Sequence, residues 1–204
     1  MRRVQSFCLK GFVAALFCFG LYDISVPLQR SGVYALAQAQ EPDFDSKKIV
    51  PFVPTPYEVV ERMLGLAQVK KGDIIYDLGS GDGRIVIAAA KKYGVKAVGF
   101  EIDPQLIKQS RENIRKEGLG HLAAIREQDI MTVNLSAATV LTMYLLPEVN
   151  LRLRPKIRQQ LKPGSRLVSH DFDMGDWKPN RTEELTDSTG RSHTLYLWRI
   201  GKSR

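Results

Sequence analysis

Short apolar segments alternate with longer amphipathic segments through the middle of the chain, and this alternation limits the fold more than any other feature. The apolar segments have the length of buried strands, and the amphipathic ones are bounded by glycine or proline, as helices often are. Strands and helices that alternate through short loops form right-handed crossovers, which give a parallel sheet with helices on both faces. The predicted strands are residues 74–76, 97–100, 123–126, 139–144 and 166–170, and the predicted helices are residues 57–69, 84–93, 104–117 and 151–161.

The end of the chain follows a different pattern. Residues 182–185 and 193–200 flank a Thr189-Gly190 turn signal and predict an antiparallel hairpin that closes the sheet. The sequence therefore predicts an α/β fold of the Rossmann-like kind, mostly parallel, with an antiparallel last strand.

A glycine-rich loop with the sequence DLGSGDGR, residues 77–84, joins the first predicted strand to the next helix. It lacks the Gly-Lys-Ser/Thr of a phosphate-binding Walker loop, and Arg84 stands where a dinucleotide fingerprint needs its third glycine. Asp77 and Asp82 would repel a pyrophosphate at the start of the helix but attract a cation. The loop therefore favours S-adenosylmethionine, which carries a sulfonium and an ammonium group.

Two further acids follow later strands. Glu101 ends the second strand, 24 residues beyond Asp77, near the separation at which an acid reaches a ribose diol in such folds. Asp129 follows the third strand, where it can accept a hydrogen bond from the adenine amine. Because ligands of open parallel sheets bind at the carboxyl ends of the strands, the three acids predict one cofactor site.

Residues 77–83 resemble the first motif of class I S-adenosylmethionine-dependent methyltransferases, and Glu101 resembles the acid of the second motif. The chain is closer still to the mitochondrial lysine methyltransferases of the ATP synthase c subunit and the adenine nucleotide carrier. That similarity includes residues 77–90, Pro-Phe-Val-Pro at residues 51–54 and Trp-Lys-Pro at residues 177–179. It implies a seven-stranded methyltransferase sheet with an antiparallel last strand. It also implies a cofactor site lined by Asp77, Gly79, Gly81, Glu101 and Asp129, to which we expect Ser80, Gly83 and Ile102 to contribute.

Candidate catalytic residues lie at the ends of the fourth and fifth strands. Tyr144 is expected to face the transferring methyl group and to orient an amine through its hydroxyl or its ring; the alternative is a tyrosine that caps a core strand. His170 or Asp171 is expected to take a proton from an ammonium acceptor, although a histidine at a strand end is often structural. Trp177 is assigned equally to a substrate wall or to packing, and His121 and His193 receive no role.

A metal site is not expected. The two cysteines, Cys8 and Cys18, lie in the first twenty residues, and the three histidines are scattered without a paired ligand spacing.

The first forty residues have the order of a secretory signal. Basic residues precede the uncharged residues 11–22, and small-residue cleavage patterns follow at residues 35–39. The uncharged segment rises only about 18 Å as a helix, short of a hydrocarbon core of roughly 30 Å. We expect residues 1–40 to be a signal peptide or an N-terminal membrane anchor, residues 41–50 a linker and residues 51–204 the methyltransferase domain. The domain is accordingly expected to be exported, periplasmic or extracytoplasmic, or tethered to the membrane by its N-terminus.

The net charge and the family resemblance together indicate which kind of molecule accepts the methyl group. Residues 41–204 carry 26 basic and 21 acidic groups, a net of +5, and this mild excess does not predict a nucleic-acid partner. The leading hypothesis is a methyltransferase for a protein lysine amine, with membrane proteins among the candidate substrates. The alternatives are a small-molecule or lipid-headgroup methyltransferase, and a module that binds S-adenosylmethionine without turnover.

Overall fold

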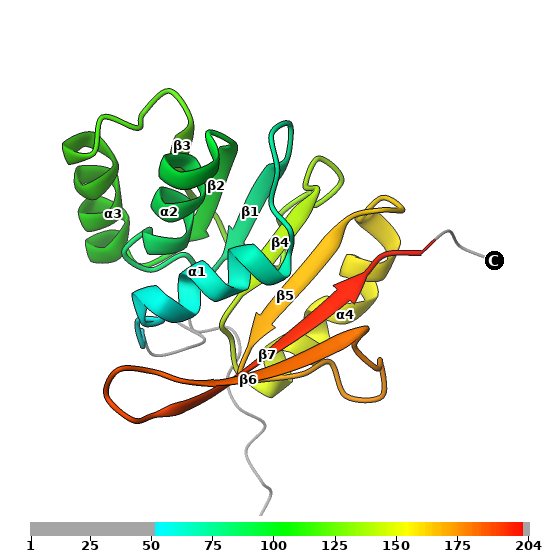
Figure 1. The fold of residues 1–204 in the computed structure, drawn as a ribbon. Helices are drawn as coiled ribbons and strands as arrows, with labels where there is room; N and C mark the ends of the chain where they lie inside the picture. The colour runs from blue at the N-terminus through cyan, green and yellow to red at the C-terminus, as the bar shows by residue number, and fades with distance from the viewer. Residues whose placement is uncertain (1–51, 202–204) are drawn as a thin grey trace, which may run out of the picture. The chain divides into compact units, whose positions relative to one another are not determined.

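A computed structural model describes residues 52–201 and contains a seven-stranded sheet with the strand order β3-β2-β1-β4-β5-β7-β6 (Figure 1). The first five strands are parallel, and β7 runs antiparallel between β5 and β6. The predicted fold class is therefore confirmed; the predicted leader, the linker and Pro51 lie outside the described residues. The strands are β1 (Ile74–Leu78), β2 (Lys96–Glu101), β3 (Ala123–Glu127), β4 (Val140–Met143), β5 (Arg166–His170), β6 (Arg181–Thr186) and β7 (Ser192–Arg199).

Four helices accompany the sheet: α1 (Tyr57–Leu66), α2 (Arg84–Tyr93), α3 (Pro104–Lys116) and α4 (Pro147–Gln160). The prediction that the last helix begins at residue 151 was wrong, because Pro147 occupies the first helical turn, where a missing N–H costs nothing. Within residues 52–201 no helix has the length and apolar character that a membrane crossing requires.

The helices divide the core into two layers, one on each face of the sheet. Helices α1, α2 and α3 pack on one face, around residues such as Ile75 and Val140, and α4 packs on the other, around Tyr76 and Leu141 (Figure 1). Consecutive residues of β1 and β4 thus point to opposite layers, as strands buried on both faces require.

A buried ion pair joins the amino-terminal ends of β1 and β5. Arg166 Nη2 lies 2.5 Å from Asp73 Oδ2, and both side chains are nearly inaccessible to solvent. The Arg166 guanidinium also donates to the backbone oxygens of Ala67 and Gln68, just after α1. Burial alone would raise the pKa of Asp73, but the hydrogen bonds from Arg166, the Lys70 N–H and Thr139, with the Arg166 charge, together outweigh it and hold the pKa below its usual value. One arginine therefore fixes α1 and two strands to each other.

Candidate active site

A pocket lies at the carboxyl ends of β1, β2 and β4, where the strand order reverses and where open α/β sheets bind their ligands. Residues 52–55, which precede α1, form a strap along the pocket. The loops after β1, β2, β3 and β4 and the first turns of α2 and α3 supply most of the remaining wall. Predicted residues in the wall are Asp77, Gly79, Ser80, Glu101, Ile102, Asp129 and Tyr144.

Glu101 ties the glycine loop to the loop after β2. Its Oε2 atom accepts from the backbone N–H of Gly81 at 2.8 Å. Its Oε1 atom accepts from the N–H groups of Ile102 and Asp103 at 2.8 and 3.0 Å. The carboxylate is thus held rigidly at the pocket wall, in the position expected for an acceptor of ribose hydroxyls.

Replacing Glu101 by glutamine should weaken binding of S-adenosylmethionine about ten- to a hundredfold, because a charged acceptor becomes neutral and an NH₂ group faces backbone donors. Calorimetric titration measures the change, and Glu127→Gln, at the exposed end of β3, is the matched control. Unchanged affinity in a folded Glu101→Gln protein would show that this carboxylate does not contact the cofactor.

Asp77 is buried at the end of β1, where Thr142 Oγ1 donates to its Oδ1 atom at 2.7 Å. Burial, with the nearby charges of Glu101 and Asp82, raises the pKa of Asp77 to about 7. A cationic group in the pocket would favour the ionised form and reverse this shift. Without a ligand, the contribution of Asp77 to folding stability falls as the pH rises from about 4 to about 7, since the folded state binds the proton more tightly.

Binding of S-adenosylmethionine at pH 6.5 should therefore release roughly three quarters of a proton, the fraction of Asp77 protonated when its pKa is about 7. The release is obtained from binding enthalpies in buffers of different ionisation enthalpy. Asp77→Asn keeps the partnership with Thr142 and should abolish the release. An equal release from both proteins would assign the proton to another group.

The glycine loop is shaped mainly by its own backbone contacts. The N–H groups of Gly79 and Ser80 both donate to the carbonyl oxygen of Phe100. A side chain at Gly79 would have its Cβ 2.9 Å from Leu145 Cδ2, and one at Gly81 would collide with the ring of Phe52 in the strap. Gly81 therefore faces the strap.

Gly83 has a different environment from the other loop glycines. It precedes α2 with φ +82°, and its open side faces Ser110 of α3 rather than the pocket. Gly83 therefore allows the turn into α2 and the close packing of this turn against α3.

Asp82 is not available to a ligand in the way that the sequence suggested. Its carboxylate pairs with the Arg84 guanidinium at 2.6 Å, and Arg84 Nη1 donates to the backbone oxygen of Thr55. The pair neutralises Asp82 and anchors the strap, so the negative charge at the pocket comes from the other lining acids, among them Asp77, Glu101 and Asp129.

Tyr144 joins the pocket to a second group of polar side chains. Its hydroxyl donates to Asp171 Oδ2 at 3.2 Å and accepts from Arg191 Nη2 at 3.3 Å, while its ring packs on that of His170. Burial, reinforced by the Asp171 charge, raises the pKa of Tyr144, so the hydroxyl keeps its proton. Asp171 has a left-handed backbone, φ +59°, and its Oδ1 atom accepts from the N–H of Thr194.

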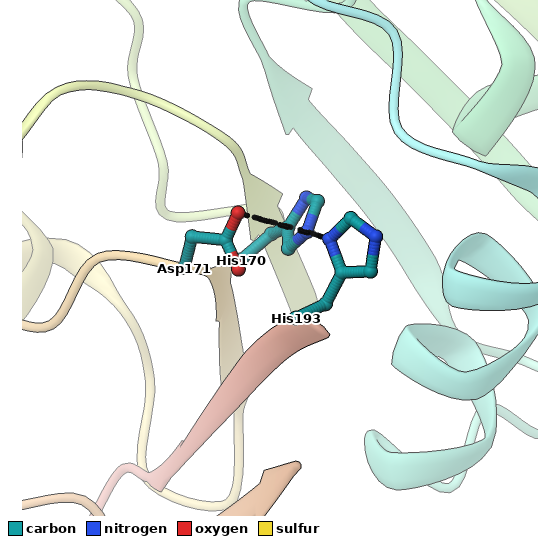
Figure 2. A group of neighbouring side chains, drawn as sticks. All are labelled: His170, Asp171 and His193. Carbon is teal, nitrogen blue, oxygen red and sulfur yellow. Dashed lines mark hydrogen bonds and ion pairs between the residues drawn. The ribbon is translucent and has the colours of Figure 1, made fainter. Parts of the chain in front are cut away.

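Behind Tyr144, His170 and His193 form a buried hydrogen-bonded pair, at 2.9 Å between Nε2 and Nδ1 (Figure 2). Hydrogen bonds from Thr189 and His193 hold the pKa of Asp187 well below its usual range, so its carboxylate must accept from His193 Nε2. In neutral His193, Nδ1 then accepts from His170 Nε2, and His170 Nδ1 accepts from the Thr55 hydroxyl.

Both ring nitrogens of His170 consequently have partners, and burial lowers the pKa of His170 to about 4. This arrangement favours Asp171 over His170 as a proton acceptor. His193, to which the sequence assigned no role, lies in β7 and completes a buried polar chain from the strap to Asp187. Trp177 packs against Trp198 in the core layer on the α4 side, in agreement with its packing alternative.

Tertiary structure also brings together potential metal ligands that no sequence spacing marks. Donor atoms of His170, Asp171 and His193 lie within 4.8 Å of one another.

The pocket suits S-adenosylmethionine in charge. Several carboxylates line it: Asp77 is buried and inclined to keep a proton unless a cation approaches, and Glu101 is held at the wall by backbone N–H groups.

Comparison with known proteins agrees with these features. The family described as the ANTKMT methyltransferase domain matches residues 77–181. A protein-lysine N-methyltransferase from Saccharolobus islandicus is 47% identical over 76% of this chain and 96% of its own length. The human lysine N-methyltransferase of the ATP synthase c subunit is 34% identical over 72% of this chain, which spans 63% of that relative.

A solved structure extends the comparison to the cofactor. An RNA methyltransferase from Salinibacter ruber, in complex with S-adenosyl-L-homocysteine, is 51% identical and has a TM-score of 0.69, over 74% of this chain and 96% of that one.

Proposed function

The chain belongs to the ANTKMT methyltransferase family, within the class I S-adenosylmethionine-dependent methyltransferases, and from this premise we propose that it methylates the side-chain amine of lysine in a protein. The names of the archaeal and human relatives support this acceptor. The observation that carries the proposal is the pairing of Tyr144 with Asp171 beside the pocket, because a hydroxyl and a carboxylate 3.2 Å apart suit an ammonium group.

When bound, the cofactor supplies a methyl group activated by a sulfonium, and transfer is an in-line displacement by a nitrogen lone pair. The lysine ammonium must therefore lose a proton first. In our proposal the Asp171 carboxylate accepts that proton, and the Tyr144 hydroxyl orients the neutral nitrogen. Glu101 and Asp77 hold the cofactor, while His170 positions the Tyr144 ring.

The test uses the purified chain, S-adenosylmethionine labelled in its methyl group, and three acceptor fractions: membrane and soluble proteins, RNA, and small molecules with lipids. Label on lysine after hydrolysis of the protein fraction supports the proposal. A matched synthetic peptide with arginine in place of lysine is the control. Label confined to lipids or small molecules would overturn the protein acceptor, and cofactor binding without label would indicate a binding module.

RNA is the second candidate acceptor, because the similar Salinibacter ruber protein is described as an RNA methyltransferase. Label that is removed by ribonuclease and not by protease would favour RNA over lysine.

Tyr144→Phe should lower the turnover number about five- to 150-fold while leaving cofactor affinity unchanged, since it removes one hydrogen bond to the reacting nitrogen and keeps the ring. Single-turnover kinetics and calorimetry separate the two quantities. Tyr93→Phe, at the end of α2, is the matched control. A parallel loss of cofactor affinity would place the hydroxyl at the cofactor instead, and equal rates would exclude a role for it.

We also propose that residues 1–40 direct the domain to the extracytoplasmic side or tether it to the membrane, which would bring it to membrane-protein substrates. The support is the charge and apolar pattern of these residues. Sequencing of the mature N-terminus and protease accessibility in intact cells test it. A full-length chain in the soluble cytosolic fraction would contradict it.

A further inference from the structure

Three side chains behind Tyr144 present donor atoms to one another, as Figure 2 shows: His170 at the end of β5, Asp171 after it, and His193 in β7. In the proposed transfer reaction Asp171 accepts a proton and His170 positions the Tyr144 ring. Neither role requires ring nitrogens of His170 and His193 to converge with a carboxylate oxygen of Asp171.

We propose that His170, Asp171 and His193 bind one zinc-class divalent cation. We further propose that the bound cation occupies the carboxylate needed for methyl transfer and so inhibits the enzyme. The binding site stands on geometry alone, whereas the inhibition rests on the proposed function.

The donor atoms have the spacing that such a cation requires. His170 Nε2 lies 2.9 Å from His193 Nδ1 and 3.4 Å from Asp171 Oδ2, and the remaining side of the triangle is 3.8 Å. The circle through three points with these separations has a radius of about 2.0 Å, so one position lies at zinc–ligand distance from all three atoms. Two imidazoles and one carboxylate also form the donor set that zinc accepts.

Both histidines carry the outer partners that orient metal ligands. Asp187 accepts from His193 Nε2, which leaves Nδ1 free to turn its lone pair inward. Thr55 Oγ1 lies 3.2 Å from His170 Nδ1, which leaves Nε2 facing the cluster. Such carboxylate and hydroxyl partners fix the ring orientation and the tautomer of ligating histidines.

The cation can bind while both histidine rings stay neutral, because His170 needs only to change its tautomer. The Nε2 proton of His170, which points at His193, is replaced by a proton on Nδ1, and the Thr55 hydroxyl changes from donor to acceptor. A cationic side chain, Arg191, lies near the site with Nη2 3.7 Å from Asp171 Oδ2, and it is 56% exposed, so it can turn toward solvent. The ligand set then offers one negative charge and two neutral imidazoles to the cation.

Binding is tested with Co²⁺, whose visible absorption reports its ligands, followed by displacement with Zn²⁺. The full chain carries Cys8→Ser and Cys18→Ser, so that no thiolate competes. We expect saturation at one Co²⁺ per chain, and at least roughly hundredfold weaker binding in His193→Gln. His121→Gln, in an exposed position, is the control and should bind as the parent does.

If the visible absorption does not saturate by about 1 mM Co²⁺, any binding is too weak for a specific site, and the proposed metal site is overturned. Equal binding in His193→Gln would overturn it as well. Asp171→Asn, in which asparagine tolerates the left-handed backbone, is the second variant if His193→Gln fails to fold, and it should also lose Co²⁺.

Inhibition is measured separately. One equivalent of Zn²⁺ should lower methyl transfer by the parent chain, relative to its own metal-free rate, and should leave the residual rate of His193→Gln unchanged. Zinc binding with unaltered transfer would overturn the inhibitory role. Because the cobalt spectrum requires no methyl acceptor, failure of the proposed function and failure of the metal site give different results.

Discussion

Asp171→Asn is expected to lower the turnover number for methyl transfer by about 10²–10⁴-fold, the usual contribution of a positioned general base. The substitution is nearly isosteric, keeps an acceptor for the Thr194 N–H, and places in the left-handed backbone a residue that tolerates it. What is lost is the ability to take a proton from the acceptor ammonium. Single-turnover rates with saturating cofactor measure the effect.

The pH profile separates a base from a structural residue. Without Asp171, solvent must deprotonate a lysine whose pKa is about 10.4, so the rate of the variant should rise about tenfold per pH unit up to that value. Asp173→Asn, two residues farther along in an exposed position, is the control and should follow the parent profile. A variant with a flat profile, or one that retains its full rate at neutral pH, would remove Asp171 from proton transfer.

Asp73→Ala is expected to lower the free energy of unfolding by about 3–5 kcal/mol, because it leaves the buried guanidinium of Arg166 without its counterion. Denaturant unfolding at neutral pH measures the loss. Since the pKa of Asp73 is lowered by folding, the stabilisation is present above about pH 4 and disappears as the pH falls through the folded-state value.

Removing both charges provides the control for this prediction. Asp73→Leu combined with Arg166→Met should recover much of the stability, because the main penalty is an uncompensated buried charge rather than a lost attraction. A single variant as stable as the parent would mean that water replaces the carboxylate. A double variant less stable than Asp73→Ala would mean that the bonds from Arg166 to the backbone oxygens after α1 dominate.

The fold could be predicted from sequence because its signals are local. Helix α2 and strand β5 have the predicted bounds, since apolar periodicity and glycine ends depend on neighbouring residues alone. The start of α4 was placed too late because Pro147 was not recognised as a first-turn residue.

The site could be predicted only where its residues sit at strand ends. Asp77, Glu101 and Tyr144 reach the pocket because parallel strands finish along one edge. His193 could not be found in this way, because its contact with His170 depends on the antiparallel register that pairs His170 with Leu195. Thr55 likewise contacts His170 across 115 residues, a separation that no local pattern encodes.

The strap at residues 52–55 contacts both the cofactor pocket and the acceptor side of the site. Its Phe52 ring covers Gly81 at the cofactor pocket, and its Thr55 hydroxyl orients His170 beneath Tyr144. A strap that moved to release the spent cofactor would also break the hydrogen bond between Thr55 and His170, beneath Tyr144 on the acceptor side. We therefore expect compulsory-order kinetics, in which the cofactor binds before the methyl acceptor.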